Sequence, residues 1–291
     1  MTSGDGFSMH LPPAPRRLPL SLQISNLFDG LTQIGFFILL FSTPFMWGFV
    51  GNADFSPITF HGAIQKTEGH VTKVENTRAS EGHQNIYANH YSFFADGRHF
   101  EGVSYSLGAP PEVSSKIAIE FDRNNPKKSR IEGMRRGQFG LGVLFVLIFP
   151  AVGLLITVFS MRASMRTLAI LSRGVMTYGT FKEKRATNVT VNRQRLYQHI
   201  FDFTAADGKT YEASATAGRS AEELTDDDRE ALLYDPAAPE KAVLIDNLSI
   251  KPEVDSSGAL KGNTGQAIRR LILPAITVGV NVLWLLHVMK Q

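Results

Sequence analysis

The sequence predicts a membrane protein of the α+β class, with three transmembrane helices and two repeated small all-β domains of barrel or sandwich type. Two observations predict this class. Residues 69–93 align with residues 179–203 at a constant offset of 110, and apolar segments at 31–50, 139–159 and 271–289 contain no Asp, Glu, Lys or Arg. Helices of that length are about 30 Å long, which matches the hydrocarbon core of a bilayer.

The first apolar segment, 31–50, follows a stretch of 30 residues that mixes Gly, Pro, Ser and Arg without periodicity. Residues 1–30 therefore predict a flexible N-terminal tail. A cleaved signal peptide would instead show a short basic start and a small-residue cleavage site. We expect 31–50 to be retained as a membrane anchor.

An aromatic strand is the centre of each repeat. The aligned residues are Tyr87 and Tyr197, Asn89 and His199, Tyr91 and Phe201, and Phe93 and Phe203. Alternation along a strand places each of these sets on one face of a sheet. We expect β-domains at 61–133 and 179–250, each a meander of four or five strands.

Turn signals divide these strands in both copies. Asp96-Gly97 matches Asp207-Gly208 at an offset of 111. Asp-Gly between alternating runs predicts a hairpin in which both turn residues have positive φ. Further on, Phe121-Asp122 matches Tyr234-Asp235 at an offset of 113.

Two connecting segments complete the expected organisation. Residues 160–178 carry Arg162, Arg166 and Arg173 between apolar positions, which predicts a basic amphipathic linker at the headgroup level or a plain continuation of the membrane helix. Residues 251–268 carry Ser, Gly and Asp and predict a linker before the last span.

The second copy combines a Gly-led entry, an aromatic strand, an Asp-Gly turn and a closing motif, in Leu171, Arg173, Gly174, Gly179, Tyr197, Phe201, Phe203, Asp207-Gly208, Tyr234-Asp235-Pro236-Ala237-Ala238-Pro239, Lys241 and Ala242. In these residues it resembles a family of bacterial membrane proteins whose small β-domain has no assigned function. The first copy departs from this closing motif, because in Phe121-Asp122-Arg123-Asn124-Asn125-Pro126 the first Pro is replaced by Arg123. The resemblance implies a membrane-anchored β-domain and no known activity.

The closing motif also has a physical interpretation. Pro236 fixes φ within a turn and Asp235 can accept a hydrogen bond from a following backbone N–H, so we expect a structural corner with Tyr234 packed in the core.

Composition excludes several classes of chemistry. The net charge is +3, from 30 basic and 27 acidic residues, which is too balanced to predict nucleic-acid binding. The chain contains no Cys, so it has no disulfide, thiolate nucleophile or Cys-based metal site. It also lacks a phosphate-binding loop and a Gly-x-Ser-x-Gly elbow. We assign no catalytic, cofactor-binding or metal-ligating residue and expect no enzyme activity.

Histidines supply the strongest alternative. His61, His70, His83, His90 and His99 lie close together in the sequence, and the predicted hairpin could bring His90 near His99. Imidazoles bind zinc or copper, but no ligand-spaced motif is present and the second copy lacks these residues. Half-exposed histidines on a β-surface are the plainer interpretation.

Other polar features are weaker. The acidic run comprises Glu222, Glu223, Asp226, Asp227, Asp228 and Glu230, and it predicts a solvated loop with Thr225 capping a short helix. Asn281 and His287 are polar groups within or near the last span, where Asn281 could bond a neighbouring helix.

Three crossings would place the two β-domains on opposite sides of the membrane. Lys and Arg near the span ends number nine on one side and eight on the other, so the positive-inside rule gives almost no orientation. A re-entrant middle segment turning at Pro150 would place both domains on one side, but an unbroken helix satisfies its own backbone and is the preferred prediction.

We therefore expect a multi-pass protein of the bacterial inner membrane that acts as a non-enzymatic interaction or scaffolding module of the cell envelope. Its expected partners are the lipid bilayer and other membrane proteins or a second copy, without nucleic acid. The alternatives are a membrane-bound metal-dependent factor that uses the His-rich first domain, or an accessory subunit of a transporter.

Overall fold

The computed structural model describes residues 11–191, 194–217, 229–245, 253–254 and 259–290. Two compact units make up the chain. We call Phe41–Ala151 the first unit, and Met1–Leu40 together with Val152–Gln291 the second unit. Each unit combines helices with one five-stranded antiparallel sheet, as the α+β prediction requires.

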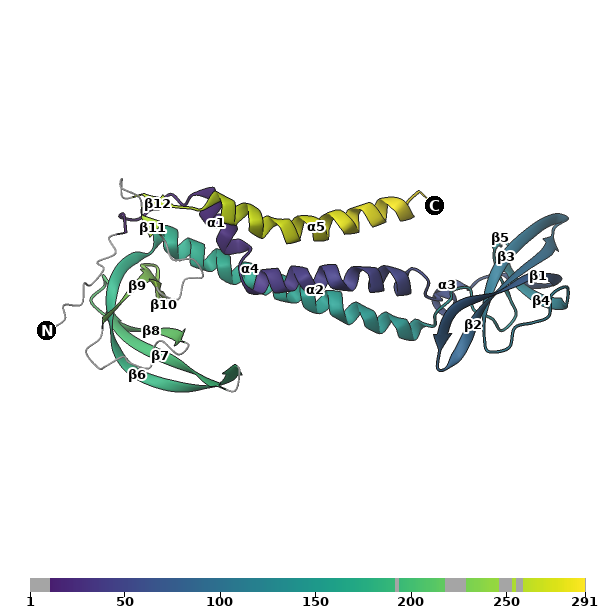
Figure 1. Ribbon diagram of the computed structural model, residues 1–291, viewed down its shortest axis with the longest axis horizontal. Helices are drawn as coiled ribbons and strands as arrows, with labels where there is room; N and C mark the ends of the chain where they lie inside the picture. The colour runs from purple at the N-terminus through teal and green to yellow at the C-terminus, as the bar shows by residue number, and fades with distance from the viewer. Residues whose placement is uncertain (1–10, 192–193, 218–228, 246–252, 255–258, 291) are drawn as a thin grey trace. The chain divides into compact units, whose positions relative to one another are not determined.

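The first sheet contains β1 (Ile64–Glu81), β2 (Gln84–Ala95), β3 (Arg98–Leu107), β4 (Lys116–Asp122) and β5 (Asn125–Ile131) (Figure 1). Its strand order is β3-β2-β1-β4-β5, so the long β1 lies at the centre. All five strands lie within the predicted domain 61–133.

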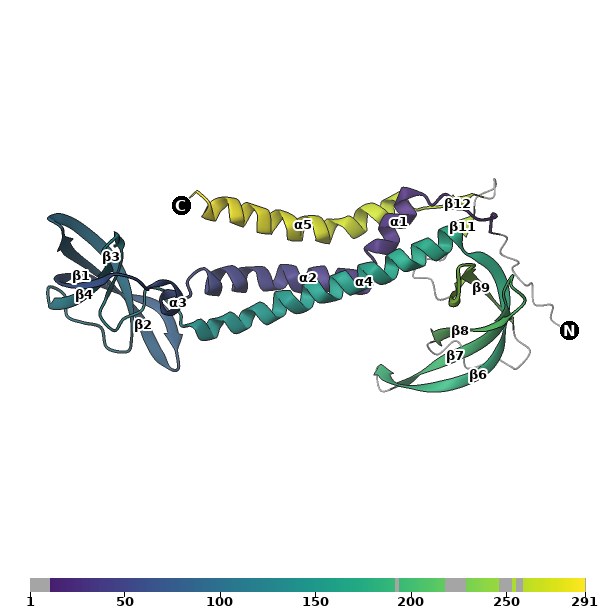
Figure 2. The same ribbon diagram turned by 180° about the vertical axis from the view of Figure 1, so that it is seen from behind.

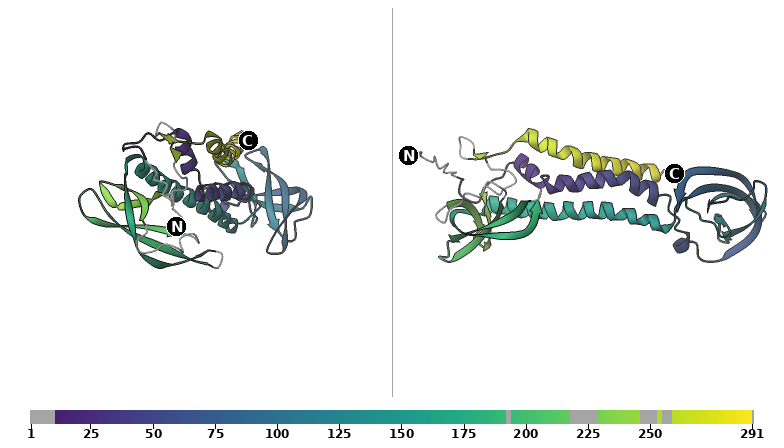
Figure 3. Two further views of the ribbon diagram at one scale, coloured as in Figure 1. Left: turned by 60° about the vertical axis from the view of Figure 1, so that its left-hand side comes forward. Right: turned by 60° about the horizontal axis from the view of Figure 1, so that its bottom comes forward.

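The first sheet curls until its two edges meet (Figure 3, right). Tyr105 on β3 and Arg135, just beyond β5, exchange two backbone hydrogen bonds of 2.8 and 3.1 Å. The Ile131 N–H also donates to Ser104 Oγ at 2.9 Å. These contacts close the sheet into a barrel-like shape around one core.

That core is built from alternate residues of the strands. It comprises Tyr91, Phe93, Ala95, Ile119, Phe121 and Ile131, with Phe100, Ile117 and Met134 packed against it. The aromatic strand predicted from the sequence therefore supplies the inner wall.

The second sheet contains β6 (Val175–Val191), β7 (Gln194–Thr204), β8 (Thr210–Ala217), β9 (Arg229–Asp235) and β10 (Ala238–Leu244) (Figure 2). Its order is β10-β9-β6-β7-β8, the same arrangement as in the first sheet. Its inner core comprises Phe201, Phe203, Ala205, Ala213, Leu232, Tyr234 and Leu244.

The two sheets agree in register as well as in order. Val71 pairs with Tyr91 and Phe181 pairs with Phe201, both at the sequence offset of 110. Bulges follow Val71 and Asn76 in β1, and they follow Phe181 and Ala186 at the equivalent places in β6. The remaining strand pairs also match at the offsets of 111 and 113, as with Glu120 opposite Arg130 and Leu233 opposite Val243.

The hairpin turns differ, which corrects one expectation. Asp96 and Gly97 have φ values of 48° and 75°, as predicted. In the second sheet only Gly208, at 77°, has positive φ, and its N–H donates to Ala205 O at 3.0 Å. The one-residue insertion lengthens the loop, so Asp207 no longer needs the left-handed conformation.

Among the described residues, three helical segments are long and apolar enough to cross a membrane. They are Leu31–Val50, made of α2 (Leu31–Phe45) and η1 (Met46–Val50); Leu141–Arg173, made of η2 (Leu141–Leu147) and α4 (Ile148–Arg173); and α5 (Thr264–Val288). The middle segment runs through Pro150 without a return turn, so the re-entrant alternative is wrong for these residues.

The two segments predicted as linkers contain helices and strands. α4 continues as one helix to Arg173 and β6 begins at Val175, so 160–178 is a helix continuation and then a strand. Within 251–268, β11 (Glu253–Val254) pairs with β12 (Leu260–Lys261), and α5 begins at Thr264. A short helix, α3 (Ser56–Thr59), follows the first apolar segment.

The predicted flexible tail 1–30 is also corrected where it is described. Helix α1 (Leu20–Leu27) lies against the start of α5 (Figures 1 and 2). Arg16 is 7% exposed, and its Nη1 donates to the carbonyls of Leu171 at 3.0 Å and Gly174 at 2.8 Å. A cation that satisfies the last carbonyls of a helix also interacts favourably with the helix dipole.

A second core in the second unit holds the N-terminal segment in place. It comprises Leu22, Ile170, Leu171, Leu233, Ile245 and Leu260, with Leu11, Leu18, Met176, Ala231 and Val243 beside them. The second sheet is therefore covered on its outer face by α1 and the end of α4, an apolar pattern too scattered along the chain to be recognised in the sequence.

Candidate functional site

The structure separates the histidines considered as metal ligands. His90 lies opposite Val103 and His99 lies opposite Phe94 on the neighbouring strand, so the predicted approach of the two imidazoles is wrong. The two-residue turn at Asp96-Gly97 fixes that register. Across the described ranges, no group of three His, Cys, Asp or Glu side chains could hold a metal ion.

The Tyr-Asp-Pro motif forms a corner of the second sheet. Asp235 Oδ1 accepts a hydrogen bond from Ala237 N at 3.0 Å, which confirms the predicted turn. Asp122 does the same for Asn124 N at 2.9 Å in the first sheet. Tyr234 is 3% exposed and its Oη accepts from Ala206 N at 3.0 Å, so the motif also ties down the β7–β8 loop.

The acidic run cannot be placed in full. Glu222, Glu223, Thr225, Asp226, Asp227 and Asp228 lie outside the described residues. Glu230 belongs to β9, opposite Gly179 of β6.

The interior of the first sheet contains a buried polar group, on the strand face where the sequence pattern placed it with the aromatic residues. Asn89 is fully buried, and its Nδ2 donates to Ser104 O at 3.3 Å and Ser106 Oγ at 2.9 Å. Nearby, Tyr91 Oη and Ser129 Oγ lie 2.9 Å apart. Burial raises the pKa of Tyr91, and the hydrogen bond to Ser129 opposes that rise.

The second sheet lacks both of these hydroxyl groups. At the positions equivalent to Tyr91 and Ser129 it has Phe201 and Ala242, and Asn89 is replaced by His199, which is 2% exposed. The polar interior of the first sheet is thus not a requirement of the shared backbone.

This polar interior lacks the arrangement of a catalytic centre. A nucleophilic serine needs a general base within hydrogen-bond reach. The hydroxyl of Ser104 instead contacts a backbone N–H and that of Ser129 contacts a phenol. These two hydroxyls are bonded inside a low-dielectric core, which favours a role in fixing the packing, whereas Asn89 Oδ1 has no partner among the described residues.

A pocket of about 250 Å³ lies in the first unit where the chain leaves the first apolar segment and approaches the second. It is lined by Gly51, Asn52, Ala53, Asp54, Phe55, Ser56, Thr59, Tyr105, Arg136, Gly137 and Gln138. Asp54 is 5% exposed, and its Oδ1 accepts from Ser56 N at 3.0 Å and Arg136 N at 3.3 Å. Asp54 therefore links the segment that follows Leu31–Val50 to the segment that precedes Leu141–Arg173.

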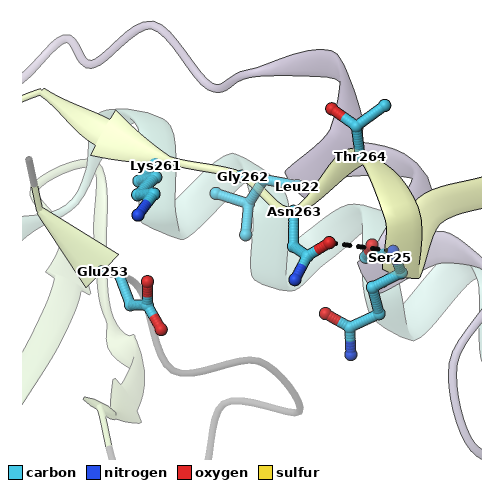
Figure 4. A pocket seen from close by; sticks show the side chains of 8 residues that line it. Leu22, Ser25, Glu253, Lys261, Gly262, Asn263 and Thr264 are labelled. Carbon is cyan, nitrogen blue, oxygen red and sulfur yellow. Dashed lines mark hydrogen bonds between the residues drawn. The ribbon is translucent and has the colours of Figure 1, made fainter.

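A larger pocket, of about 360 Å³, lies in the second unit at the start of α5 (Figure 4). Leu22 and Ser25 from α1 form one side, and Glu253 of β11 and Lys261 of β12 project from the paired strands. Gly262, Asn263, Thr264 and Gln266 complete the lining. Asn263 Oδ1 caps the helix by accepting from Gln266 N at 2.9 Å.

Sequence reasoning missed both pockets, although local signals mark one side of each. Asp54 followed by Ser56-Pro57 is a helix-start pattern, and Asn263 followed three residues later by Gln266 resembles a capping box. The other sides come from residues far away in the chain, which no local pattern can specify.

The two polar residues of the last span are both in α5. Asn281 Nδ2 donates to Thr277 O at 2.9 Å, one turn earlier in its own helix. Thr277 Oγ1 in turn lies 3.3 Å from the Phe36 carbonyl of α2. His287 lies in the last turn of α5.

One aromatic side chain is exposed at the tip of the first sheet. Phe94 is 64% exposed, and its ring lies 5.3 Å from the ring of His99 in an edge-on arrangement. The equivalent residues of the second sheet are Thr204 and Thr210. Exposed aromatic residues are enriched at the centres of protein interfaces.

The sequence matches no protein-family model, and no curated protein is significantly similar to it.

Proposed function

We propose that the chain is a multi-pass protein of the bacterial inner membrane, in which two duplicated β-domains act as non-enzymatic interaction modules of the cell envelope. The proposed spans lie within the helical segments Leu31–Val50, Leu141–Arg173 and Thr264–Val288. Their side chains are mostly exposed, with no more than 17% of each apolar window buried. Lipid is the environment in which so much exposed apolar surface is stable.

The shared register is the observation that carries the duplication. Two unrelated meanders can share a strand order, because few simple antiparallel orders exist. They have no reason to share both bulges at one constant offset, since each bulge inserts an unpaired residue at a particular place. The resemblance to a family of bacterial membrane proteins, which also rests on the second copy, stays a prediction.

A single crossing by each apolar helix would place the two β-domains on opposite sides of the membrane. The continuous helix Leu141–Arg173 supports this, because it is about 50 Å long at 1.5 Å per residue and exceeds the hydrocarbon thickness. A protein with paired domains on the two sides could connect partners in two compartments.

The surface and the interior of the first sheet favour a role in protein interaction over a role in catalysis. Its buried hydroxyls bond one another, whereas Phe94 and His99 are exposed together at a hairpin tip. An exposed aromatic residue costs solvation free energy unless a partner covers it. We propose that this tip contacts another membrane protein or a second copy of the chain.

Cysteine labelling tests the topology, and the chain has no native Cys to interfere. Single substitutions Arg98→Cys and Ala206→Cys place thiols at exposed sites beside the two hairpin loops. A membrane-impermeant thiol reagent applied to intact cells should label only one of them, while both label in lysed cells. Labelling of both sites, or of neither, in intact cells would exclude the three-crossing arrangement.

Photocrosslinking tests the interaction. A photoreactive residue at Phe94 should yield an adduct in native membranes, and one at the equivalent Thr204 serves as the comparison. Recovery of monomer alone from the Phe94 position, with normal membrane insertion, would contradict the proposed role of this tip.

A further inference from the structure

The pocket at the start of α5 combines three features that point to one class of ligand. The first is an unbonded buried hydroxyl. Ser25 is 2% exposed, lines the pocket, and its Oγ has no hydrogen-bond partner among the residues that the structure describes. A buried hydroxyl without a partner is unfavourable by about 1–3 kcal/mol, so its persistence indicates a missing partner.

The second feature is the N-terminus of α5. The helix has 25 residues, and its first-turn N–H groups and positive dipole end lie beside the pocket lining residues Asn263, Thr264 and Gln266. Helix N-termini are favourable sites for phosphate and carboxylate groups. Lys261, on the neighbouring strand, adds a positive charge to the same side.

The third feature is an acidic side chain, Glu253, next to the basic side chain of Lys261. Glu253 pairs in register with Lys261 and also lines the pocket, and the two side chains project from neighbouring strands (Figure 4). Exposed opposite charges on paired strands attract each other only weakly, so an ionic ligand can contact both. A simple anion would be repelled by Glu253, whereas a ligand with a cation next to its phosphate would not.

The depth of the pocket agrees with this chemistry. The apolar part of the last span begins at Leu271, seven residues after α5 starts at Thr264. At 1.5 Å per residue this places the pocket about 10 Å outside the hydrocarbon edge, which is the level of lipid headgroups. This step rests on the proposed membrane location of α5.

We infer that this pocket binds a phosphoethanolamine group, with its phosphate at Ser25, Lys261 and the α5 N-terminus and its ammonium at Glu253. The membrane location indicates a phospholipid headgroup as the source. A soluble phosphoethanolamine ester has the same recognition chemistry and is the other source to be distinguished.

The test uses the full chain, purified in detergent and freed of lipid, with bound lipid counted by native mass spectrometry. Phosphatidylethanolamine and phosphatidylglycerol with identical acyl chains are added separately. The ethanolamine lipid should bind about tenfold more tightly than the glycerol lipid, the value of one charge-assisted contact.

Variants assign the contacts. Lys261→Gln should lower the affinity for both lipids about tenfold, and Ser25→Ala should lower the affinity for both about fivefold. Glu253→Gln should remove the preference between the two lipids and leave binding of the glycerol lipid unchanged or stronger. Lys261 and Glu253 are exposed, so their substitution should not affect folding, and Lys209→Gln in the β7–β8 loop is the matched control.

A competition experiment distinguishes a phospholipid headgroup from a soluble phosphoethanolamine ester as the ligand. Soluble phosphoethanolamine should displace the ethanolamine lipid only at much higher concentration, and inorganic phosphate should displace it less well still. Displacement at equal concentration would overturn the lipid assignment. Equal binding of both lipids to the parent chain and all variants would show adventitious lipid only and overturn the site. Because the soluble arm needs no membrane, its result stands even if the labelling test rejects the proposed crossings.

Discussion

At the residue scale, the two sheets show how one backbone position constrains another. A Cβ added to Gly102 would lie 2.5 Å from Tyr91 Cζ and still closer to Oη. The second sheet has Ala213 at the position of Gly102 and Phe201 at that of Tyr91. Loss of the phenolic oxygen removes the nearest of these contacts, and the ring must also shift to admit the alanine methyl group because Cζ remains.

This pair gives a reciprocal prediction. Gly102→Ala alone should destabilise the first unit by about 2 kcal/mol, because an added methyl group overpacks a closed core. Tyr91→Phe combined with Gly102→Ala should recover most of that loss. Pulse proteolysis of the full chain in detergent would measure both, and additive losses in the double variant would contradict the explanation.

Arg16 shows how a polar side chain can hold a segment that the sequence predicts to be loose. Burial lowers the pKa of its guanidinium, and carbonyl groups of α4 compensate the charge. The main chain adds to this contact, because Arg16 N donates to Ser172 O at 2.7 Å and Ser172 Oγ donates to Arg16 O at 2.9 Å.

Replacement of this arginine should therefore release the N-terminal segment. Arg16→Ala should lower the free energy of unfolding by about 2 kcal/mol, since hydrogen bonds from a charged donor are lost. The segment before α1 should become sensitive to limited proteolysis. The exposed neighbour Arg17 provides the control, and equal cleavage of Arg16→Ala and Arg17→Ala chains would refute the role.

Glu81 predicts a pH dependence in the first unit. Its hydrogen bonds to Arg135, at 2.6 Å, and to the Gly140 N–H, at 3.3 Å, lower its pKa. A lowered folded-state pKa contributes stability that is present above the unfolded value of about 4.3 and is lost as the pH falls through the folded value. The side chains are about one-third exposed, so solvent screening limits the effect.

Glu81→Gln should flatten the dependence of stability on pH below about pH 5. Thermal unfolding in detergent between pH 3 and pH 7 would measure it, with the exposed Glu101→Gln as the matched control. An unchanged slope in Glu81→Gln would show that this contact does not couple to folding.

At the element scale, close packing of α2 and α4 depends on small residues. A Cβ on Gly35 would overlap Thr157 Oγ1 and lie 2.9 Å from Gly153 O. Thr32 Oγ1 also donates to Ser160 Oγ at 2.8 Å across the same contact. Small residues of this kind let helix backbones approach in a membrane, where dispersion and hydrogen bonds replace the hydrophobic effect.

Gly35→Leu should therefore separate α2 from α4 and destabilise the helices by about 2–3 kcal/mol. Gly48 lies in the same apolar segment, but a Cβ there meets nothing within 4 Å. Gly48→Ala should be tolerated. Thermal unfolding of the two variants in detergent would compare them, and equal stability would contradict the proposed contact.

The hairpins show where an element could be predicted and where it could not. Asp-Gly marks a turn in both sheets, and both turns occur. The conformation of Asp207 could not be predicted from the dipeptide alone, because the adjoining Ala206 changes the loop length and its N–H bonds Tyr234. Loop length, rather than the dipeptide, decides the turn type.

At the scale of the whole molecule, the two sheets have the same strand order and register but different interiors. The first is lined by hydroxyl groups around Asn89, and the second has His199 among apolar residues. The second sheet is also covered on its outer face by α1 and α4. Under the proposed duplication, later divergence would give each sheet its own stability and its own surface.

The sequence by itself determined the features that depend on neighbouring residues. Apolar runs of about 20 residues predicted the three long helices. Alternation and turn dipeptides predicted the strands, and the constant offset aligned two sets of strands whose order and bulges agree. These patterns are local, so the chain carries them without reference to its fold.

Only the tertiary structure decided the contacts between distant parts of the chain. Arg16 bonds a carbonyl 155 residues away, and the pocket at α5 joins Ser25 to residues beyond position 250. Asp54 likewise meets Arg136 across 82 residues. Such contacts depend on how the elements pack, and a single polar residue without periodicity gives no signal of the partner it will find.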